Sequence, residues 1–146
     1  MKTMDATKMG RITIEFDIAN NQDLAMVARG HMKPSEVRRA TLFGIVDTGA
    51  TRLVLPQEVV KKLGLPVKRN KVKVTYADGR RGTRTEVDDV RLFLMGRDGV
   101  FNAIVEPKRE TALIGAIVLE DLDLLIDCAK LRLVPRDPNF VISEIE

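Results

Sequence analysis

Apolar and polar residues alternate along several short stretches of this chain, which is the pattern of half-buried β-strands. The first stretch is residues 11–17, in which Ile12, Ile14 and Phe16 alternate with polar residues. The same criteria predict strands at residues 24–28, 37–46, 67–76, 83–95, 100–105, 124–126, 131–134 and 140–142. Short strands that follow one another this closely predict an all-β fold, either a barrel or a sandwich.

Helical signals are confined to two segments, so we expect one or two short helices. Residues 56–64 start with Pro56, which suits the first turn of a helix, and end at Gly64, which suits the position after the last turn. Acids near the start of this segment and lysines near its end agree with the helix dipole. Residues 116–122 are the second helical candidate.

Asp-Gly pairs mark two expected turns in the second half of the chain. Asp78-Gly79 separates two of the predicted strands, and Asp-Gly in that position is a strong hairpin signal. Asp98-Gly99, preceded by Arg97, predicts another turn ahead of the next strand.

The composition is that of a folded protein. Hydrophobic residues make up 45% of the 146 residues and charged residues 31%, which argues against a disordered chain. Because no repeat or linker divides the sequence, we expect one domain over residues 1–146 with its core at about 11–135. Cys128 is the only cysteine, and no signal peptide or apolar run of membrane-spanning length is found. We therefore expect a soluble, cytoplasmic protein without an intrachain disulfide and without membrane contact.

Positive charge is concentrated between residues 61 and 84, where the only acid is Asp78. A solvated face on two strands is the simplest explanation of such a run. The composition disfavours nucleic acid as a partner, because Tyr76 is the only aromatic residue among these cations and platforms for base stacking are missing.

The strongest chemical signal is Asp47-Thr48-Gly49-Ala50, which follows the continuously apolar end of the strand predicted at 37–46. A strand of that kind runs into the interior, so it would aim Asp47 at the interior or at a cleft. Gly49 allows close approach of the backbone, and Thr48 can hydrogen-bond to backbone nearby. Because a buried carboxylate needs a partner or a proton, Asp47 is a candidate functional residue.

Residues 43–51, Phe-Gly-Ile-Val-Asp-Thr-Gly-Ala-Thr, resemble the active-site signature of aspartic proteases, in which apolar residues precede Asp-Thr-Gly, a small residue and Ser or Thr. The continuation through residues 53–65 is similar to the single-domain retropepsin-like proteins of prokaryotes. Downstream, residues 112–115 resemble the apolar-apolar-Gly segment of that family, and residues 124–127 its closing strand. The resemblance covers roughly residues 37–134 and implies a retropepsin-like acid protease barrel.

The resemblance also implies roles for individual residues of the active-site loop. Asp47 would be the catalytic residue, and the loop would be completed by Thr48, Gly49, Ala50 and Thr51. In this family the threonine that matches Thr48 locks two such loops together across a dimer axis. The glycine that matches Gly49 offers backbone groups to the substrate.

Two further segments receive roles from the same resemblance. Leu113, Ile114 and Gly115 would pack beside the catalytic loop and support it. A flap, the hairpin that closes over bound peptide, would supply the substrate-binding residues Thr75, Tyr76, Ala77, Asp78 and Gly79. If the chain is a protease, Arg80 and Arg81 near this flap would favour acidic substrates.

The family reaction implies a homodimer. It activates one water between two facing aspartates, one acting as general base and the other, protonated, polarising the scissile carbonyl. Since this sequence has one Asp-Thr-Gly, the second aspartate must be Asp47 of an identical chain. Two carboxylates at such a short distance cannot both ionise, so the pair would share one proton. The enzyme would then cleave peptides at pH values on the acid side of neutral. The mechanism needs no cofactor and no metal.

Other functions fit the sequence less well. The same fold could serve as a dimerisation or peptide-binding module without proteolysis, because fold does not establish activity. Nucleic-acid binding through the basic stretch ranks last. A zinc site is not expected, since His31 is the only histidine and Cys128 the only cysteine.

Overall fold

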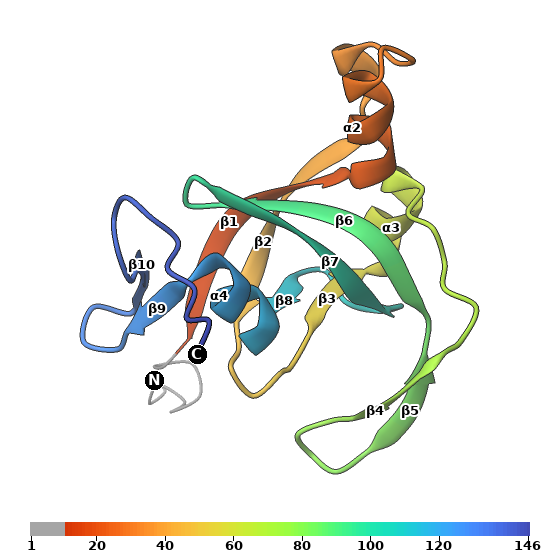
Figure 1. Ribbon diagram of the computed structural model, residues 1–146. Helices are drawn as coiled ribbons and strands as arrows, with labels where there is room; N and C mark the ends of the chain where they lie inside the picture. Colours follow the sequence, from red (N-terminus) through yellow and green to blue (C-terminus); the bar gives the residue numbers. More distant parts are fainter. Residues whose placement is uncertain (1–10) are drawn as a thin grey trace.

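The computed structural model describes residues 11–146, and six of the strands in that range close into a barrel (Figure 1). The strands follow the barrel in the order β1-β2-β8-β3-β7-β6. The elements in chain order are β1 (Ile12–Asn20), α2 (Asn21–Ala28), the 3-10 helix η1 (Pro34–Glu36), β2 (Arg39–Val46), β3 (Leu53–Pro56), α3 (Gln57–Leu63), β4 (Val72–Thr75), β5 (Arg81–Arg84), β6 (Glu86–Leu94), β7 (Arg97–Glu106), β8 (Ala112–Ile114), α4 (Ala116–Leu122), β9 (Leu124–Asp127) and β10 (Arg132–Pro135). The prediction of an all-β fold is confirmed, and the barrel is the form it takes.

Strand β8 is inserted between β2 and β3, although it comes late in the chain. It runs parallel to β2, with Gly44 opposite Ala112 and Val46 opposite Ile114. It also pairs with β3, which in turn runs parallel to β7. The carboxyl ends of β2 and β8 therefore lie side by side, and the segments that follow them meet at one end of the barrel.

The barrel interior is filled by apolar side chains that alternate with more exposed residues along the strands. In β1, Ile12, Phe16 and Ile18 are buried while the residues between them are more exposed. Gly44 on β2 makes room for Phe16, because a Cβ atom at this glycine would lie 2.7 Å from Phe16 Cε1. Helices α3 and α4 each add buried apolar side chains to the same core, such as Leu63.

Residues 24–28 are helical, so the strand predicted there was wrong. Asn20, fully buried at the end of β1, caps α2: its Oδ1 accepts hydrogen bonds from the backbone N–H groups of Gln22 (2.9 Å) and Asp23 (3.1 Å). Its Nδ2 donates to the Leu63 carbonyl at 2.9 Å, which ties the start of α2 to the end of α3. The apolar pattern cannot show this cap, and the capping bonds decide in favour of a helix.

The helix predicted at 56–64 is confirmed as α3, and Gly64 follows it in the left-handed conformation that its sequence position suggested. The helix predicted at 116–122 is confirmed as α4. Together with α2 and η1, residues 11–146 contain four short helices, more than the one or two expected. The longest of those in residues 11–146 has eight residues, and none there could cross a membrane.

The turn before β7 lies two residues earlier than predicted. Met95 and Gly96 carry the positive φ angles of the β6–β7 turn, 53° and 77°, so Arg97, Asp98 and Gly99 belong to β7. The strand predicted at 83–95 is divided into β5 and β6. Likewise, the strand predicted at 67–76 is formed only at β4, and the one at 37–46 begins at Arg39.

Residues 140–142 form no strand, which corrects the last strand prediction. Backbone groups of this tail are bound by side chains instead. Arg97 Nη2 donates to the Phe140 carbonyl at 3.0 Å, and Asp123 Oδ2 accepts from the Ile142 N–H at 2.9 Å. Arg136 Nε pairs with Asp123 Oδ1 at 2.9 Å. Side-chain partners therefore replace the neighbouring strand that a β-ladder needs.

Asp23 makes part of the stability dependent on pH. Arg38 Nε and Nη2 each donate to it at 2.9 Å, and this side-chain hydrogen bonding holds the pKa of Asp23 below its ordinary value against the opposing effect of burial. Because the folded pKa is depressed, the stabilisation is fully present above the unfolded value of about 3.9 and is lost as the pH falls through the lower folded value.

We expect Asp23→Asn to lower the free energy of unfolding at pH 7 by roughly 1–2 kcal/mol, the lower end being favoured because Arg38 is half exposed. The difference between variant and wild type should shrink as the pH falls below about 4. Urea unfolding at pH 7 and pH 3 measures both effects, and an equal loss at the two pH values would contradict this role.

Candidate active site

Asp47 directly follows β2 and is fixed by three hydrogen bonds. Its N–H donates to the Ile114 carbonyl (3.0 Å), which extends the ladder between β2 and β8. Its Oδ1 accepts from the Gly49 N–H (2.9 Å), and its carbonyl accepts from the Ala50 N–H (3.1 Å). Within residues 11–146 no other hydrogen bond reaches the carboxylate. Oδ2 is thus left available on a half-buried side chain, while Thr48 and Gly49 are exposed at the loop tip.

The start of α4 supports this loop from behind. The backbone N–H groups of Ala116 and Ile117 donate to the carbonyls of Ala50 (2.9 Å) and Thr51 (3.0 Å). These are free amides of the first helical turn, so the loop uses donors that the helix itself cannot satisfy. Through these bonds the position of the loop depends on the position of α4.

Gly115, between β8 and α4, packs directly on the loop backbone. A Cβ atom at this position would lie 2.3 Å from the Arg52 carbonyl oxygen and 2.8 Å from that of Ala50. Its neighbours in β8 pair with the strands on either side: Leu113 lies opposite Ile45 and Val54, and Ile114 opposite Val46. The segment predicted to support the loop is therefore in contact with it.

The residues expected in a flap lie at the tip of the β4–β5 hairpin, which projects from the barrel (Figure 1). Thr75 pairs with Arg81 at the end of the ladder, and Tyr76 N–H donates to the Arg80 carbonyl at 2.8 Å. Ala77, Asp78 and Gly79 form the exposed turn, with Gly79 at φ +87°. The hairpin thus forms where Asp-Gly predicted it.

Tyr76 connects this hairpin to the barrel through Glu106, the last residue of β7. The Tyr76 hydroxyl donates to Glu106 Oε2 at 2.5 Å, and Arg84 Nε donates to Glu106 Oε1 at 2.9 Å. Burial is the main cause of a raised Tyr76 pKa, and the hydrogen bond to Glu106 adds to it. Sequence reasoning did not find Glu106, because nothing local marks a carboxylate 30 residues away as the partner of Tyr76.

Arg80 is engaged within the hairpin itself. Its Nε donates to Asp78 Oδ2 at 2.7 Å, and its guanidinium lies over the Tyr76 ring, 4.9 Å from the ring centre. Arg81 is exposed and lies on the opposite face from the half-buried side chains of the hairpin. Asp78 thus neutralises the positive charge of Arg80, one of the two arginines expected to favour acidic substrates.

Comparison with protein families finds a model whose match includes the Asp47 loop and Gly115. A family model described as gag-polyprotein putative aspartyl protease matches residues 36–121, more than half of the chain. The chain belongs to this aspartyl protease family. Comparison with curated proteins gives no match.

The match to the aspartyl protease family spans β2, the Asp47 loop, the β4–β5 hairpin, β8 and most of α4. It leaves out β1, which closes the barrel between β2 and β6, and the separate β9–β10 hairpin. The elements that position Asp47 and Gly115 therefore lie inside the matched region.

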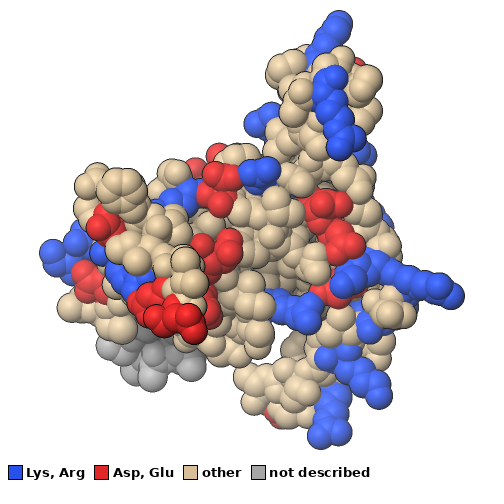
Figure 2. All heavy atoms as spheres, viewed as in Figure 1, with Lys and Arg blue, Asp and Glu red and all other residues tan. Residues whose placement is uncertain are grey.

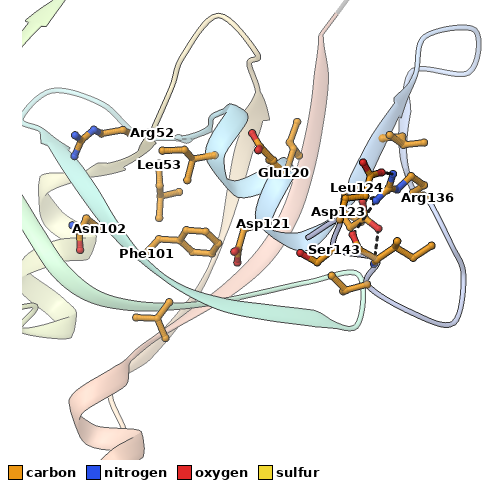
Figure 3. A pocket seen from close by; sticks show the side chains of 17 residues that line it. Arg52, Leu53, Phe101, Asn102, Glu120, Asp121, Asp123, Leu124, Arg136 and Ser143 are labelled. Carbon is orange, nitrogen blue, oxygen red and sulfur yellow. Dashed lines mark hydrogen bonds and ion pairs between the residues drawn. The ribbon is translucent and has the colours of Figure 1, made fainter. Parts of the chain in front are cut away.

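A groove of about 1050 Å³ lies between β7, α4 and the C-terminal tail, and Asp47 does not line it (Figure 3). Arg52 stands at one end of the groove, and the Asp123–Arg136 ion pair at the other. Over residues 11–146 no cluster of three or more His, Cys, Asp or Glu side chains is arranged to hold a metal ion.

Tyr76 is the only tyrosine in the chain and there is no tryptophan, so its titration can be followed alone by ultraviolet absorbance. We expect the wild-type phenol to titrate above the ordinary value of about 10. Replacing Glu106 by Gln removes the negative charge that opposes phenolate formation and should move the titration back toward that value. The exposed Glu110→Gln is the matched control. An unchanged titration in Glu106→Gln would rule out the Tyr76–Glu106 contact in solution.

Proposed function

We propose that this protein is an aspartic endopeptidase that acts as a homodimer, with one Asp47 from each subunit. The observation that carries the proposal is the placement of Asp47. Its loop is fixed by β8 and by the first amides of α4, while one carboxylate oxygen stays unbound by residues 11–146. A rigid loop with an available carboxylate oxygen is what general acid–base catalysis on a bound water requires.

The proposed reaction needs a second carboxylate, which the symmetric partner would supply. In residues 11–146 Asp47 makes no hydrogen bond to another carboxylate. Two copies of the exposed loop tip meeting about a two-fold axis would bring the Asp47 side chains together, with Thr48 at the contact. One carboxylate would then activate the water while the other, protonated, polarises the peptide carbonyl.

The β4–β5 hairpin is the proposed cover for the substrate. Thr75, Tyr76, Ala77, Asp78 and Gly79 lie at its projecting tip. Tyr76 is held by Glu106, so the hairpin has a fixed resting position from which it could close over a bound peptide. Closure of such a hairpin would exclude bulk water from the reacting centre and retain the one water held by the carboxylates.

The proposal is tested by measuring peptide cleavage between pH 4 and pH 7 over a wide range of protein concentrations. A dimeric enzyme shows a rate that rises faster than linearly with concentration while monomers predominate. Its activity should be higher on the acid side of neutral, where one proton is shared by the pair. A folded dimer that binds peptides without cleaving them would instead support a binding module.

A further inference from the structure

Arg109 is a half-buried cation in the segment that joins β7 to β8. Its Nε donates to the Thr111 carbonyl at 2.7 Å, and its Nη2 lies 3.4 Å from Thr111 Oγ1. Within residues 11–146 it forms no ion pair with a carboxylate. The guanidinium is therefore oriented by Thr111 but not neutralised.

Three arginines around the candidate site, Arg80, Arg84 and Arg52, have a carboxylate partner. Arg80 pairs with Asp78, and Arg84 with Glu106 at 2.9 Å. Arg52, just after the catalytic loop, pairs with the buried Glu86. Arg109 differs from all three, since it has lost part of its hydration without gaining a counter-charge in the described part of the chain.

Arg109 also lies near the strand that leads to Asp47, because it donates to Thr111, and the next residue, Ala112, pairs with Gly44 on β2. Burial lowers the pKa of Arg109, Glu106 and Asp47 act in the opposite direction, and Arg11 acts in the same direction as burial. Arg11 immediately precedes Ile12, which pairs with Val46, the residue before Asp47. Arg11 comes just before β1 and Arg109 shortly before β8, and these two strands flank β2, which leads to the proposed catalytic Asp47.

A partly desolvated guanidinium is stabilised when a carboxylate completes its hydrogen bonds. Arg109 uses Nε for Thr111, so its terminal nitrogens still have N–H groups to offer. An aspartate or glutamate side chain of a bound peptide supplies the matching acceptors. An apolar side chain in the same place would leave the guanidinium without a partner, which is the less favourable arrangement.

We propose that Arg109 is a specificity-determining residue that binds an acidic side chain of the substrate near the scissile bond. This inference rests on the proposed function, because it assumes that peptide binds beside Asp47. It moves the source of acidic preference from Arg80 and Arg81, which lie on the hairpin, to a cation in the β7–β8 segment. Arg11 adds positive potential to the same region.

Binding to the Asp47→Asn variant tests the inference without cleavage. The probes are fluorescent peptides in matched pairs, with Glu or Gln at each position flanking a central apolar pair. We expect at least one position at which Glu binds about tenfold more tightly than Gln, and we expect Arg109→Gln to abolish that difference. The matched control is Arg81→Gln, an exposed arginine of the hairpin, which should keep it.

Three results would overturn the inference: equal binding of Glu and Gln peptides at all positions, a preference that survives Arg109→Gln, or binding too weak to measure for every pair. Kinetics with the wild-type protein separate this inference from the proposed function. Cleavage of Glu and Gln peptides at equal kcat/KM would leave a protease without the Arg109 preference. An Arg109-dependent preference in binding, together with no cleavage of any peptide, would support the inference and contradict the protease function.

Discussion

Replacing Asp47 by Asn is expected to reduce peptide cleavage by at least about a thousandfold, because both subunits then lose the group that accepts and donates protons. The fold should be unaffected. The structural role of the side chain is to accept the Gly49 N–H through Oδ1, and the amide oxygen of asparagine can accept the same hydrogen bond. The variant should therefore unfold at nearly the same urea concentration as the wild type.

The matched control for this substitution is Asp121→Asn, which changes an exposed aspartate of α4 in the same way. Cleavage rates, circular dichroism and urea midpoints are compared for the three proteins. If Asp47 is catalytic, the Asp47→Asn variant is folded and inactive while the control is folded and active. Residual cleavage within tenfold of the wild type would show that Asp47 is not catalytic.

Replacing Gly115 by Ala should both destabilise the protein and inactivate it. The new methyl group would meet backbone atoms of the Asp47 loop, the nearest at 2.3 Å, and backbone cannot move aside as the end of a flexible side chain can. The loop or α4 must shift, which breaks the bonds from Ala116 and Ile117 to the loop carbonyls. We expect a loss of roughly 2–4 kcal/mol in the free energy of unfolding.

Gly82→Ala is the matched control for this effect. A Cβ atom at Gly82 would lie 3.1 Å from Arg84 Nη1, the end of a flexible side chain, so its cost should stay below about 1 kcal/mol. Urea unfolding gives the two stabilities, and cleavage at a temperature where both variants are folded gives the activities. If Gly115→Ala were as stable and active as Gly82→Ala, the contact between Gly115 and the loop would not matter.

The parts of the site that the sequence reveals are those determined by neighbouring residues. The apolar end of β2 and the Asp-Thr-Gly turn are adjacent in the chain, so their pattern alone indicates a directed carboxylate at Asp47. Helix α3 was predictable for the same reason, because its acids, lysines and Gly64 lie within one short segment. Asp78-Gly79 likewise marks the β4–β5 hairpin locally.

The parts that the sequence does not reveal depend on contacts between distant segments. Asn20 caps the helix of residues 21–28 through Gln22 and Asp23, but its burial and its bond to Leu63, 43 residues away, come from the fold. Glu106 matters because it binds Tyr76, and Arg109 matters because β8 lies beside β2. Neither contact changes the pattern of apolar and polar residues around Glu106 or Arg109. No alternation of apolar and polar residues encodes such partners.

The distribution of charged side chains over the surface also depends on the fold. Figure 2 shows Lys and Arg side chains gathered over the projecting β4–β5 hairpin and acidic side chains near the C-terminal tail. The basic stretch of the sequence is therefore largely a surface of the hairpin, with Lys71, Lys73 and Arg81 exposed on it. Arg80 and Arg84, counted with these residues in the sequence, are instead paired with Asp78 and Glu106.

Mixing wild-type and variant subunits shows whether one active site needs Asp47 from two chains. Wild-type protein at fixed concentration is incubated with increasing Asp47→Asn variant, and cleavage is measured after exchange of subunits. Mixed dimers carry one aspartate and should be inactive, so a tenfold excess of variant should leave about a tenth of the activity of a fully dimeric wild type. Activity that stays constant as the variant is added, while mixed dimers are shown to form, would contradict the shared site.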